Sequence, residues 1–265
     1  MSQARLARAY ERALKLEKAG EPGAVAAWEA VLALDPTDPG GAAMRLAALG
    51  AAPAPDRAAL AYVATLFDQH AEVFETVLVD QLEYGAPMLM RERLQARGLG
   101  PFAAMLDLGC GTGLAAEAVE DMTARRVGVD LAPGMIEAAG EKELYDALFV
   151  GDAERFLAET EERFDLVAAM DVLPYLGTVA PLLAAARACM ETGGVLALST
   201  ETMPEAAFAG RPYAVTPHQR FAHRDADLRA ALKEAGFAVI DAEAFMVRRE
   251  LGAPIPGWLI LAEAV

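Results

Sequence analysis

Residues 105–114 read MLDLGCGTGL, a short apolar run that passes into a turn with three closely spaced glycines. Glycines at positions 109, 111 and 113 let the backbone turn tightly and approach a ligand closely. A helix that begins at Leu114 adds free N–H donors at the same place. Dinucleotide-binding turns follow G-x-G-x-x-G, whereas here the third glycine comes one residue earlier. The stretch therefore predicts a strand, a turn and a helix that bind a nucleotide-like ligand.

Short apolar runs alternate with helical stretches beyond Pro101, which is typical of a parallel sheet with crossover helices. We predict strands at Ala104–Leu108, Arg126–Asp130, Ala147–Val150, Asp165–Met170, Gly194–Thr200, Ala238–Arg248 and Trp258–Ala264. The helices between and after them are predicted at Leu114–Asp121, Gly134–Lys142, Ala153–Thr160, Pro181–Met190 and Asp225–Ala235. Because the loop 252–257 is too short for a crossover helix, the last two strands are expected to form an antiparallel hairpin. The expected fold is a doubly wound α/β domain with a mostly parallel, seven-stranded sheet.

The N-terminal part is rich in alanine and leucine at helical spacing. It predicts a helical hairpin, Ala4–Ala19 and Ala24–Leu34, and a third helix around Gly41–Leu49. The hairpin is interpreted either as an appendage that docks a protein partner or self-associates, or as a cap on the main domain. A short linker, Gly50–Asp56, separates an appendage (1–52) from the main domain (53–265). Further helices are predicted at Arg57–Phe67, Ala71–Glu83 and Pro87–Gly98.

Composition excludes several classes of protein. With 39 acidic and 23 basic residues the formal charge is −16, which disfavours nucleic acid and anionic membranes as partners. The densest basic stretches, Arg91–Arg97 and Arg248–Arg249, are interleaved with Glu92 and Glu250 and are interpreted as solvated faces. No apolar run approaches the roughly 20 residues of a membrane span, so we expect a cytoplasmic protein. Two cysteines and three histidines provide poorly for a metal site, and none is expected.

The glycine stretch and four later segments together resemble the class I S-adenosylmethionine-dependent methyltransferases. The later segments are Val127–Ile136, Val150–Glu154, Phe164–Leu173 and Gly193–Ser199, in the order of the family's motifs. The whole chain also resembles the predicted methyltransferases that carry a tetratricopeptide repeat. That part of the resemblance rests on Ala24, Trp28, Val31, Leu32 and Pro36. The resemblance implies a Rossmann-like fold, S-adenosylmethionine as cofactor and S-adenosylhomocysteine as product.

The resemblance also assigns residues to the cofactor. Asp130, about 20 residues beyond the glycines, would bind the ribose hydroxyls, the alternative being a helix cap. Asp107 would attract the ammonium group, the alternative being a turn cap. Asp152 would accept from the adenine amine. The other implied cofactor residues are Gly109, Cys110 and Gly111 at the methionine part, Leu131, Met135 and Ala153 at adenine, Met170 of the fourth motif, and Phe67 and Phe74 of a lid segment in which Phe74 replaces the usual tyrosine.

Candidate catalytic and acceptor residues follow the fourth and fifth strands. Asp171 and Tyr175 lie where the acceptor approaches an open α/β sheet, and Asp171 is expected to be a base, a ligand of the cofactor amine or a loop acid. The segment Phe208–Arg224 is long for a connection and is interpreted as an acceptor lid. Within it, Tyr213, Arg220 and His223 are the candidates: Arg220 would hold a carboxylate or phosphate, and His223 would act as a base or cap a helix.

These observations predict a methyltransferase that acts on a small molecule by in-line displacement. Two alternatives stay open. One is methylation of a protein or a carrier-bound acyl group docked by the N-terminal hairpin, and the other is a non-catalytic protein that binds S-adenosylmethionine. A nicotinamide dehydrogenase is disfavoured by the glycine spacing.

Overall fold

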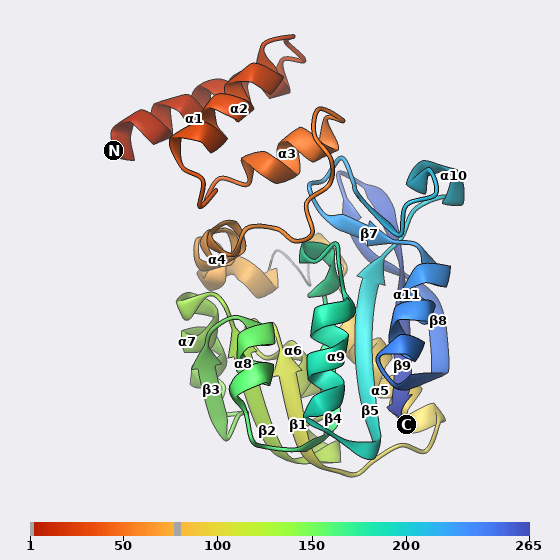
Figure 1. Cartoon of the computed structure of the whole chain (residues 1–265). Coiled ribbons are helices and arrows are strands. Elements are labelled where there is room, and N and C mark those ends of the chain that lie inside the picture. The colour runs from red at the N-terminus through yellow and green to blue at the C-terminus, as the bar shows by residue number, and fades with distance from the viewer. Residues whose placement is uncertain (1–2, 77–80) are drawn as a thin grey trace.

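A computed structural model describes residues 3–76 and 81–265 of the chain. Its centre is a twisted sheet in which strands 3-2-1-4-5 are parallel and β9 adds to β5 antiparallel, followed by β8 (Figure 1). These strands are β1 (Phe102–Leu108), β2 (Thr123–Asp130), β3 (Ala147–Val150), β4 (Phe164–Ala169), β5 (Met190–Glu201), β8 (Phe237–Glu250) and β9 (Ala253–Ala264). The predicted fold class, including the C-terminal antiparallel hairpin, is confirmed.

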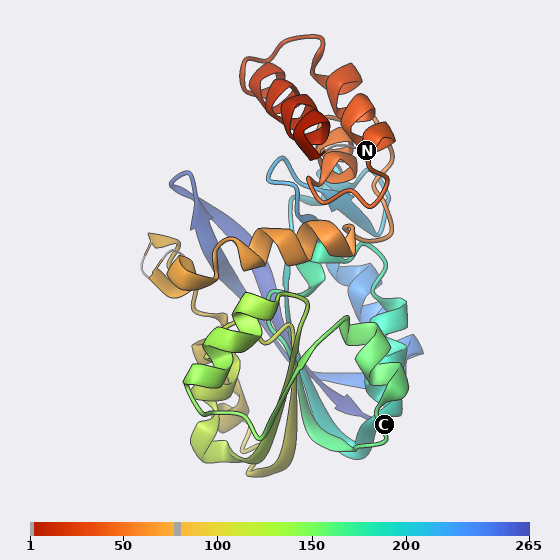
Figure 2. The same cartoon turned by 90° about the vertical axis from the view of Figure 1, so that its left-hand side faces the viewer.

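Helices cover both faces of the sheet, which produces three layers (Figure 2). Successive strand residues point to opposite faces, so Leu106 packs in the cluster beneath α8, α9 and α11, whereas Met105 packs beneath α5 and α6. The covering helices are α5 (Ala86–Ala96), α6 (Leu114–Ala118), α7 (Pro133–Glu141), α8 (Ala153–Glu159), α9 (Ala180–Ala188) and α11 (Asp225–Glu234). Burial on both faces explains why the parallel strands read as continuous apolar runs.

The segment Phe208–Arg224 is not the open loop that the sequence suggested. It contains β6 (Tyr213–Val215) and β7 (Phe221–His223), preceded by the short helix α10 (Glu205–Phe208). β7 pairs with the last residue of β5 through Glu201 and Ala222, and β6 pairs with β7 antiparallel. Pairing satisfies backbone groups that a buried loop would leave without partners. The segment is therefore a small hairpin at the carboxyl end of β5.

The loop predicted at 252–257 is also shorter than expected. β8 runs to Glu250 and β9 begins at Ala253, so the chain reverses at Leu251 and Gly252. Pro254 and Pro256 lie inside β9, where the strand pairs only with β8, because pairing with β5 begins at Gly257. A strand edge tolerates proline since no N–H donor is needed on its open side.

The N-terminal helices are α1 (Gln3–Lys18), α2 (Ala24–Leu34) and α3 (Ala42–Ala48). Trp28, fully buried, anchors the hairpin: Tyr10 packs edge-on against it, and its indole N–H donates to Glu17 at 2.7 Å. Met44 of α3 packs instead with Tyr175 and Phe221 of the main domain. The domain boundary at residue 52 and the tetratricopeptide resemblance stay predictions.

The chain then crosses the carboxyl ends of the strands. α4 (Leu60–Asp68) begins three residues later than predicted, because Arg57 is extended and pairs with Leu176. The helix expected at 71–83 begins as a single 3₁₀ turn, η1 (Ala71–Val73), and its residues 77–80 lie outside the described residues. Within the described ranges no helix has both the length and the apolar character needed to cross a membrane.

Candidate active site

The glycine turn after β1 has the left-handed backbone that its sequence requires. Gly109, Gly111 and Gly113 have φ of 62°, 53° and 94°. The turn is held by its own amides, since Cys110 N donates to Val129 O at 3.0 Å and Gly111 N donates to Asp130 Oδ2 at 2.9 Å. A Cβ atom on Gly109 would lie 2.7 Å from Val172 Cγ2. The turn therefore lies directly against the segment that follows β4.

Replacing Gly109 by alanine is expected to destabilise the fold and to displace the turn. The left-handed conformation costs an L-residue about 1–2 kcal/mol, and the contact with Val172 adds to that cost. Thermal unfolding should show the loss. Gly210→Ala is the matched control, because Gly210 also has a positive φ but a Cβ there meets nothing within 4 Å. Equal losses in the two variants would contradict close packing at Gly109.

Asp130 ends β2 and accepts hydrogen bonds from the glycine turn and from the segment that follows β2. Its Oδ2 accepts from Gly111 N, and its Oδ1 accepts from Ala132 N at 2.9 Å. Burial raises the pKa of this carboxyl group. Asp130 does not cap α7, whose N-cap residue is Ala132. Since each carboxylate oxygen can accept a second hydrogen bond, Asp130 can still bind two hydroxyl groups.

Asp107 is fully buried beneath the turn. Tyr145 donates its hydroxyl proton to Asp107 Oδ2 at 2.7 Å, and burial raises the pKa of Asp107 to about 7. Tyr145 comes from the loop before β3, and no sequence signal singled it out. A buried carboxyl group with one neutral partner favours a cationic ligand beside it.

Asp152 accepts hydrogen bonds from two groups that the sequence analysis did not identify. It caps α8, accepting from Arg155 N at 3.1 Å, and it accepts from Arg57 Nη2 at 2.6 Å. Arg57 also lies 3.4 Å from Glu154. Arg57 comes from the segment before α4, 95 positions from Asp152 in the chain. The N-terminal segment therefore closes this end of the site with an ion pair.

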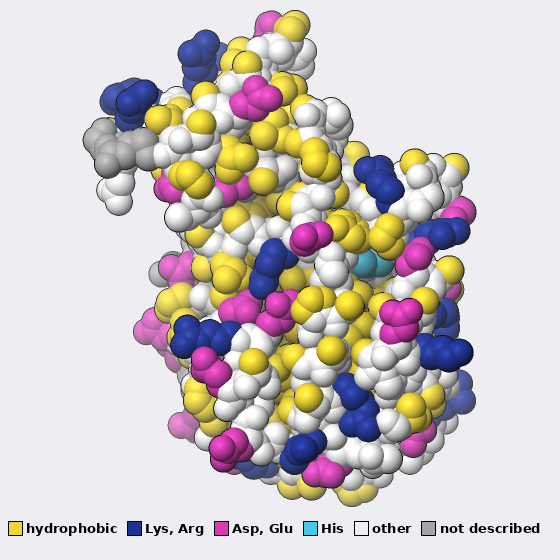
Figure 3. All heavy atoms as spheres, in the orientation of Figure 1, with side chains coloured by type: hydrophobic (Ala, Val, Ile, Leu, Met, Phe, Trp, Pro, Cys, Tyr) yellow, Lys and Arg dark blue, Asp and Glu magenta, His cyan; other side chains and the backbone are white. Residues whose placement is uncertain are grey.

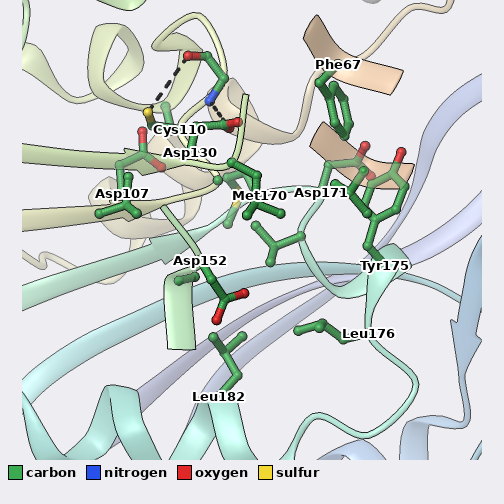
Figure 4. Close-up of a pocket in the computed structure, with 18 of the residues that line it drawn as sticks. Phe67, Asp107, Cys110, Asp130, Asp152, Met170, Asp171, Tyr175, Leu176 and Leu182 are labelled. Carbon is green, nitrogen blue, oxygen red and sulfur yellow. Dashed lines mark hydrogen bonds between the residues drawn. The ribbon is translucent and has the colours of Figure 1, made fainter. Parts of the chain in front are cut away.

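A cavity of about 1030 Å³, including the part open to solvent, lies among these residues (Figure 4). It is lined by all but one of the predicted cofactor residues and by two others: Phe67, Phe74, Asp107, Gly109, Cys110, Gly111, Asp130, Leu131, Asp152, Ala153, Met170, Asp171 and Tyr175. Arg57, Tyr84 and Thr112 also line it, and of these only Thr112 stood within a recognised motif.

Met135 is the predicted cofactor residue that does not line the cavity. It is fully buried in α7. The first turn of α7 lies against α4, where Gly134 N donates to Asp68 Oδ1 at 2.8 Å. This position does not favour the expected contact of Met135 with an adenine ring, which stays a prediction.

The segment 56–76 forms the roof of the cavity. Ala58 N donates to Tyr175 O at 2.9 Å, and Gly177 N and Thr178 N both donate to Asp56 O at 2.8 Å. Further along, Phe67 packs edge-on against both Phe74 and Tyr175, with ring centroids 5.8 and 5.4 Å apart. Phe67 and Phe74 of the roof thus supply apolar cover to the cavity.

His223 is outside the cavity and does not have the geometry of a base. Its Nδ1 lies 2.7 Å from Thr200 Oγ1, and its Nε2 lies 2.8 Å from Leu176 O. Burial lowers the pKa of this imidazole to about 4. Because both ring nitrogens have protein partners and the ring is buried, this geometry does not favour the predicted catalytic and substrate roles of His223. The residue ties β7 to β5 and to the end of η4 (Leu173–Tyr175).

Tyr213 also lies outside the cavity lining. Its hydroxyl donates to Asp56 Oδ1 at 3.0 Å, and its ring packs against Phe221. The residue holds the roof segment to the β6–β7 hairpin. Its predicted contact with the substrate is therefore not supported.

Arg220 is buried in a network of charges behind the cavity wall. Its Nη2 donates to Asp171, its Nε to Glu201 and its Nη1 to the hydroxyl oxygen of Tyr175, and its guanidinium lies 4.8 Å from the Tyr175 ring centre. Arg248 binds Glu201 from the other side. This geometry does not favour the expectation that Arg220 holds a substrate anion, because each of its three guanidinium nitrogens donates to a protein group.

Arg248 was interpreted as part of a solvated face, and this is wrong. Only 3% of the residue is exposed, and it pairs with Glu201 and with Glu250. Burial disfavours the charge on Glu201, yet Arg220 and Arg248 hold the pKa of this carboxyl group below its usual value. On the face that Figure 3 shows, acidic and basic side chains are interspersed.

Asp171 reaches the cavity through a strained backbone. Its φ is 60°, which is uncommon for a residue other than glycine, and its amide donates to Ser199 Oγ at 2.8 Å. Figure 4 shows its side chain beside that of Tyr175 and below Phe67. Strain of this kind is retained where surrounding groups over-determine the conformation, and it gathers at functional sites.

Comparison with known proteins is consistent with this geometry. Residues 81–242 match the model of the methyltransferase domain family. The ubiquinone biosynthesis O-methyltransferase of Azorhizobium caulinodans is 35% identical over 161 residues, which cover 54% of this chain and 62% of that protein. The protein of the same name from Xanthomonas campestris pv. campestris is 34% identical over 118 residues, 43% of this chain and 49% of its own length. The matches thus span 49–62% of the length of these two curated relatives.

Solved structures share the fold at low identity. The N-methyltransferase NodS of Bradyrhizobium japonicum, in complex with S-adenosylhomocysteine, has a TM-score of 0.58 and 15% identity, covering 76% of this chain and 98% of NodS. An S-adenosylmethionine-dependent methyltransferase of Clostridium acetobutylicum has a TM-score of 0.54 and 15% identity, covering 75% and 98%. Since the family model matches more than half of the chain and contains the glycine turn and Asp130, this chain belongs to the methyltransferase domain family.

Proposed function

We propose that this chain transfers the methyl group of S-adenosylmethionine to a small-molecule acceptor. The observation that carries the proposal is the pairing of the glycine turn with Asp130, whose carboxylate is fixed by Gly111 N and Ala132 N at the cavity wall. A ribose offers two adjacent hydroxyl donors to such a carboxylate. The lining of the same cavity also offers Asp107 to an ammonium group and Asp152 to a nucleobase.

The donor set fits the cofactor group by group. Asp107 suits an ammonium group, since it is buried with one neutral partner. Asp152 keeps acceptor capacity for an adenine amine beyond its bonds to Arg57 and Arg155, and Leu131 supplies apolar contact for the ring. Phe67 and Phe74 cover the cavity from α4 and the turn beyond it.

S-adenosylmethionine supplies a methyl group on a sulfonium sulfur, which an acceptor atom displaces in line. The protein's part is to align the acceptor and keep water out. Asp171 and Tyr175 are the polar groups of the wall beside the roof, so we assign them to the acceptor. Two relatives are named O-methyltransferases, which favours an oxygen atom as the acceptor.

The enclosing roof favours a small molecule over a macromolecule. Segment 56–76 is bonded across the carboxyl ends of the strands, where a protein side chain would otherwise enter. For the N-terminal helices we propose the role of a cap, which the packing of Met44 with Tyr175 and Phe221 supports.

Cofactor affinity should depend on pH through Asp107. Below its pKa of about 7 the carboxyl group is protonated, and a bound ammonium group favours the ionised form. Binding at low pH therefore releases a proton, so affinity should rise by up to about tenfold per unit as the pH approaches 7 and level off above it. Calorimetry across this pH range, in buffers of different ionisation enthalpy, measures both the affinity and the number of protons released. In Asp107→Asn affinity should be lower and independent of pH; an unchanged pH dependence there would contradict the assignment.

Methyl transfer itself is tested with labelled S-adenosylmethionine and a panel of phenols, amines and carbon acids, by following S-adenosylhomocysteine and the labelled product. We expect turnover of at least one hydroxyl acceptor by the wild-type chain and none by Asp130→Ala. Tight cofactor binding with no transfer to any acceptor would favour a non-catalytic role. Equal transfer by both proteins would refute the proposed cofactor site.

A further inference from the structure

The cavity wall carries more acidic than basic side chains. Its lining includes five acidic side chains, those of Asp107, Asp130, Asp152, Glu154 and Asp171. Among residues 3–76 and 81–265, one cationic side chain lines it, Arg57, and this is already bound to Asp152 and Glu154. A wall of this kind attracts a cationic ligand and repels an anionic one, more strongly than in water because the surroundings are partly apolar.

The part of the cavity beside Asp171, to which we assign the acceptor, is also acidic and otherwise apolar. Its acidic group is Asp171, whose carboxylate accepts from Arg220 and whose backbone amide donates to Ser199 Oγ. The other groups there are largely apolar, among them Phe67, Phe74 and Tyr84. Arg220 stands behind this wall, outside the lining, with Asp171 and Tyr175 between it and the cavity. Its charge is thus used by protein carboxylates and is not offered to a ligand.

We propose that the acceptor is an apolar molecule that is uncharged, or cationic, where it enters the cavity, and that Asp171 excludes carboxylates and phosphates. Asp171 accepts a hydrogen bond from the hydroxyl or amine of the acceptor, and Arg220 is a positioning residue that holds Asp171 towards it. This inference rests on the proposed function and adds the charge class of the substrate. It replaces the expectation that Arg220 recognises an anion.

The test uses two probes with the same naphthalene ring, 2-naphthol and 2-naphthoate. Each is titrated into the full chain saturated with S-adenosylhomocysteine. At neutral pH the first is uncharged and the second is an anion. We expect naphthol to bind the wild-type complex at least about tenfold more tightly. In Asp171→Asn the order should reverse, because Arg220 loses one of its two carboxylate partners and attracts the anion. A gain of naphthoate binding cannot arise from loss of structure.

Glu250→Gln is the matched control. It removes one negative charge from the same network, at Arg248, but Glu250 does not line the cavity. The ratio of naphthol to naphthoate affinity should stay that of the wild type. If the ratio shifts as far as in Asp171→Asn, the selectivity comes from net charge and the assignment to Asp171 falls.

Three results would overturn the inference. They are equal or tighter binding of naphthoate by the wild type, no binding of naphthol, and an unchanged ratio in Asp171→Asn. If Asp171→Asn does not fold, the wild-type comparison decides by itself. Failure of S-adenosylhomocysteine to bind the wild type would instead refute the proposed function, and this inference with it, so the two failures are distinguishable.

Discussion

Replacing Asp130 by alanine is expected to weaken the binding of S-adenosylmethionine by about a hundredfold or more. Hydrogen bonds to a charged group contribute about 1.5–3 kcal/mol each, and Asp130 is proposed to bind both ribose hydroxyls. The substitution also removes the acceptor that holds Gly111 N, so the glycine turn loses one of its supports. Calorimetric titration of both proteins measures the difference.

Asp130→Asn separates these two contributions. The amide oxygen can still accept from one backbone N–H, but the charge and one acceptor are lost, so its affinity should lie between those of the wild type and Asp130→Ala. Circular dichroism establishes that each variant is folded. Affinities within threefold of the wild type in a folded Asp130→Ala protein would exclude Asp130 from the cofactor site.

Replacing Arg220 by methionine should cause the largest loss of stability. The substitution removes the cation that Asp171 and Glu201 share, so Glu201, which is only 1% exposed, keeps Arg248 alone. Removing one partner of a buried ion pair costs about 3–5 kcal/mol. For a chain of this size that corresponds to a fall of about 6–20 °C in the temperature of unfolding.

Arg125→Met is the control for this prediction. Arg125 pairs with Glu162 at 2.9 Å, but the two side chains are 40% and 46% exposed. Exposed pairs contribute about 0–1 kcal/mol, so thermal unfolding should change little. A loss in Arg220→Met no greater than in Arg125→Met would mean that the buried network does not stabilise the fold.

The parts of the fold that depend on local sequence were predictable. β3 and α2 have the predicted bounds, and the glycine turn has the conformation that its residues require. Continuous apolar runs identified the buried strands, because such runs need cover on both faces. Bounds failed where long-range pairing decides them: Arg57 is extended through its bridge with Leu176, and β9 begins before its prolines because that edge is open.

In the candidate site, too, local sequence identified some residues, whereas contacts between distant segments decided the roles of others. Positions at strand ends, such as Asp130 and Asp171, were identified because parallel strands present their carboxyl ends at one edge. Residue type alone misled for Arg220 and His223, which looked like substrate groups but have protein partners. Nothing in the local sequence tells whether a buried cation faces a ligand or a carboxylate from a distant strand. Arg57 was missed for the same reason, since Asp152 is remote in the chain.

The most direct test of the account is calorimetric titration of the wild-type chain with S-adenosylmethionine and, separately, with S-adenosylhomocysteine. Binding of each ligand at a single site, with competition between the two, is the predicted result. A folded chain, free of copurified ligand, that binds neither would contradict the account, because the glycine turn and Asp130 would then serve another ligand.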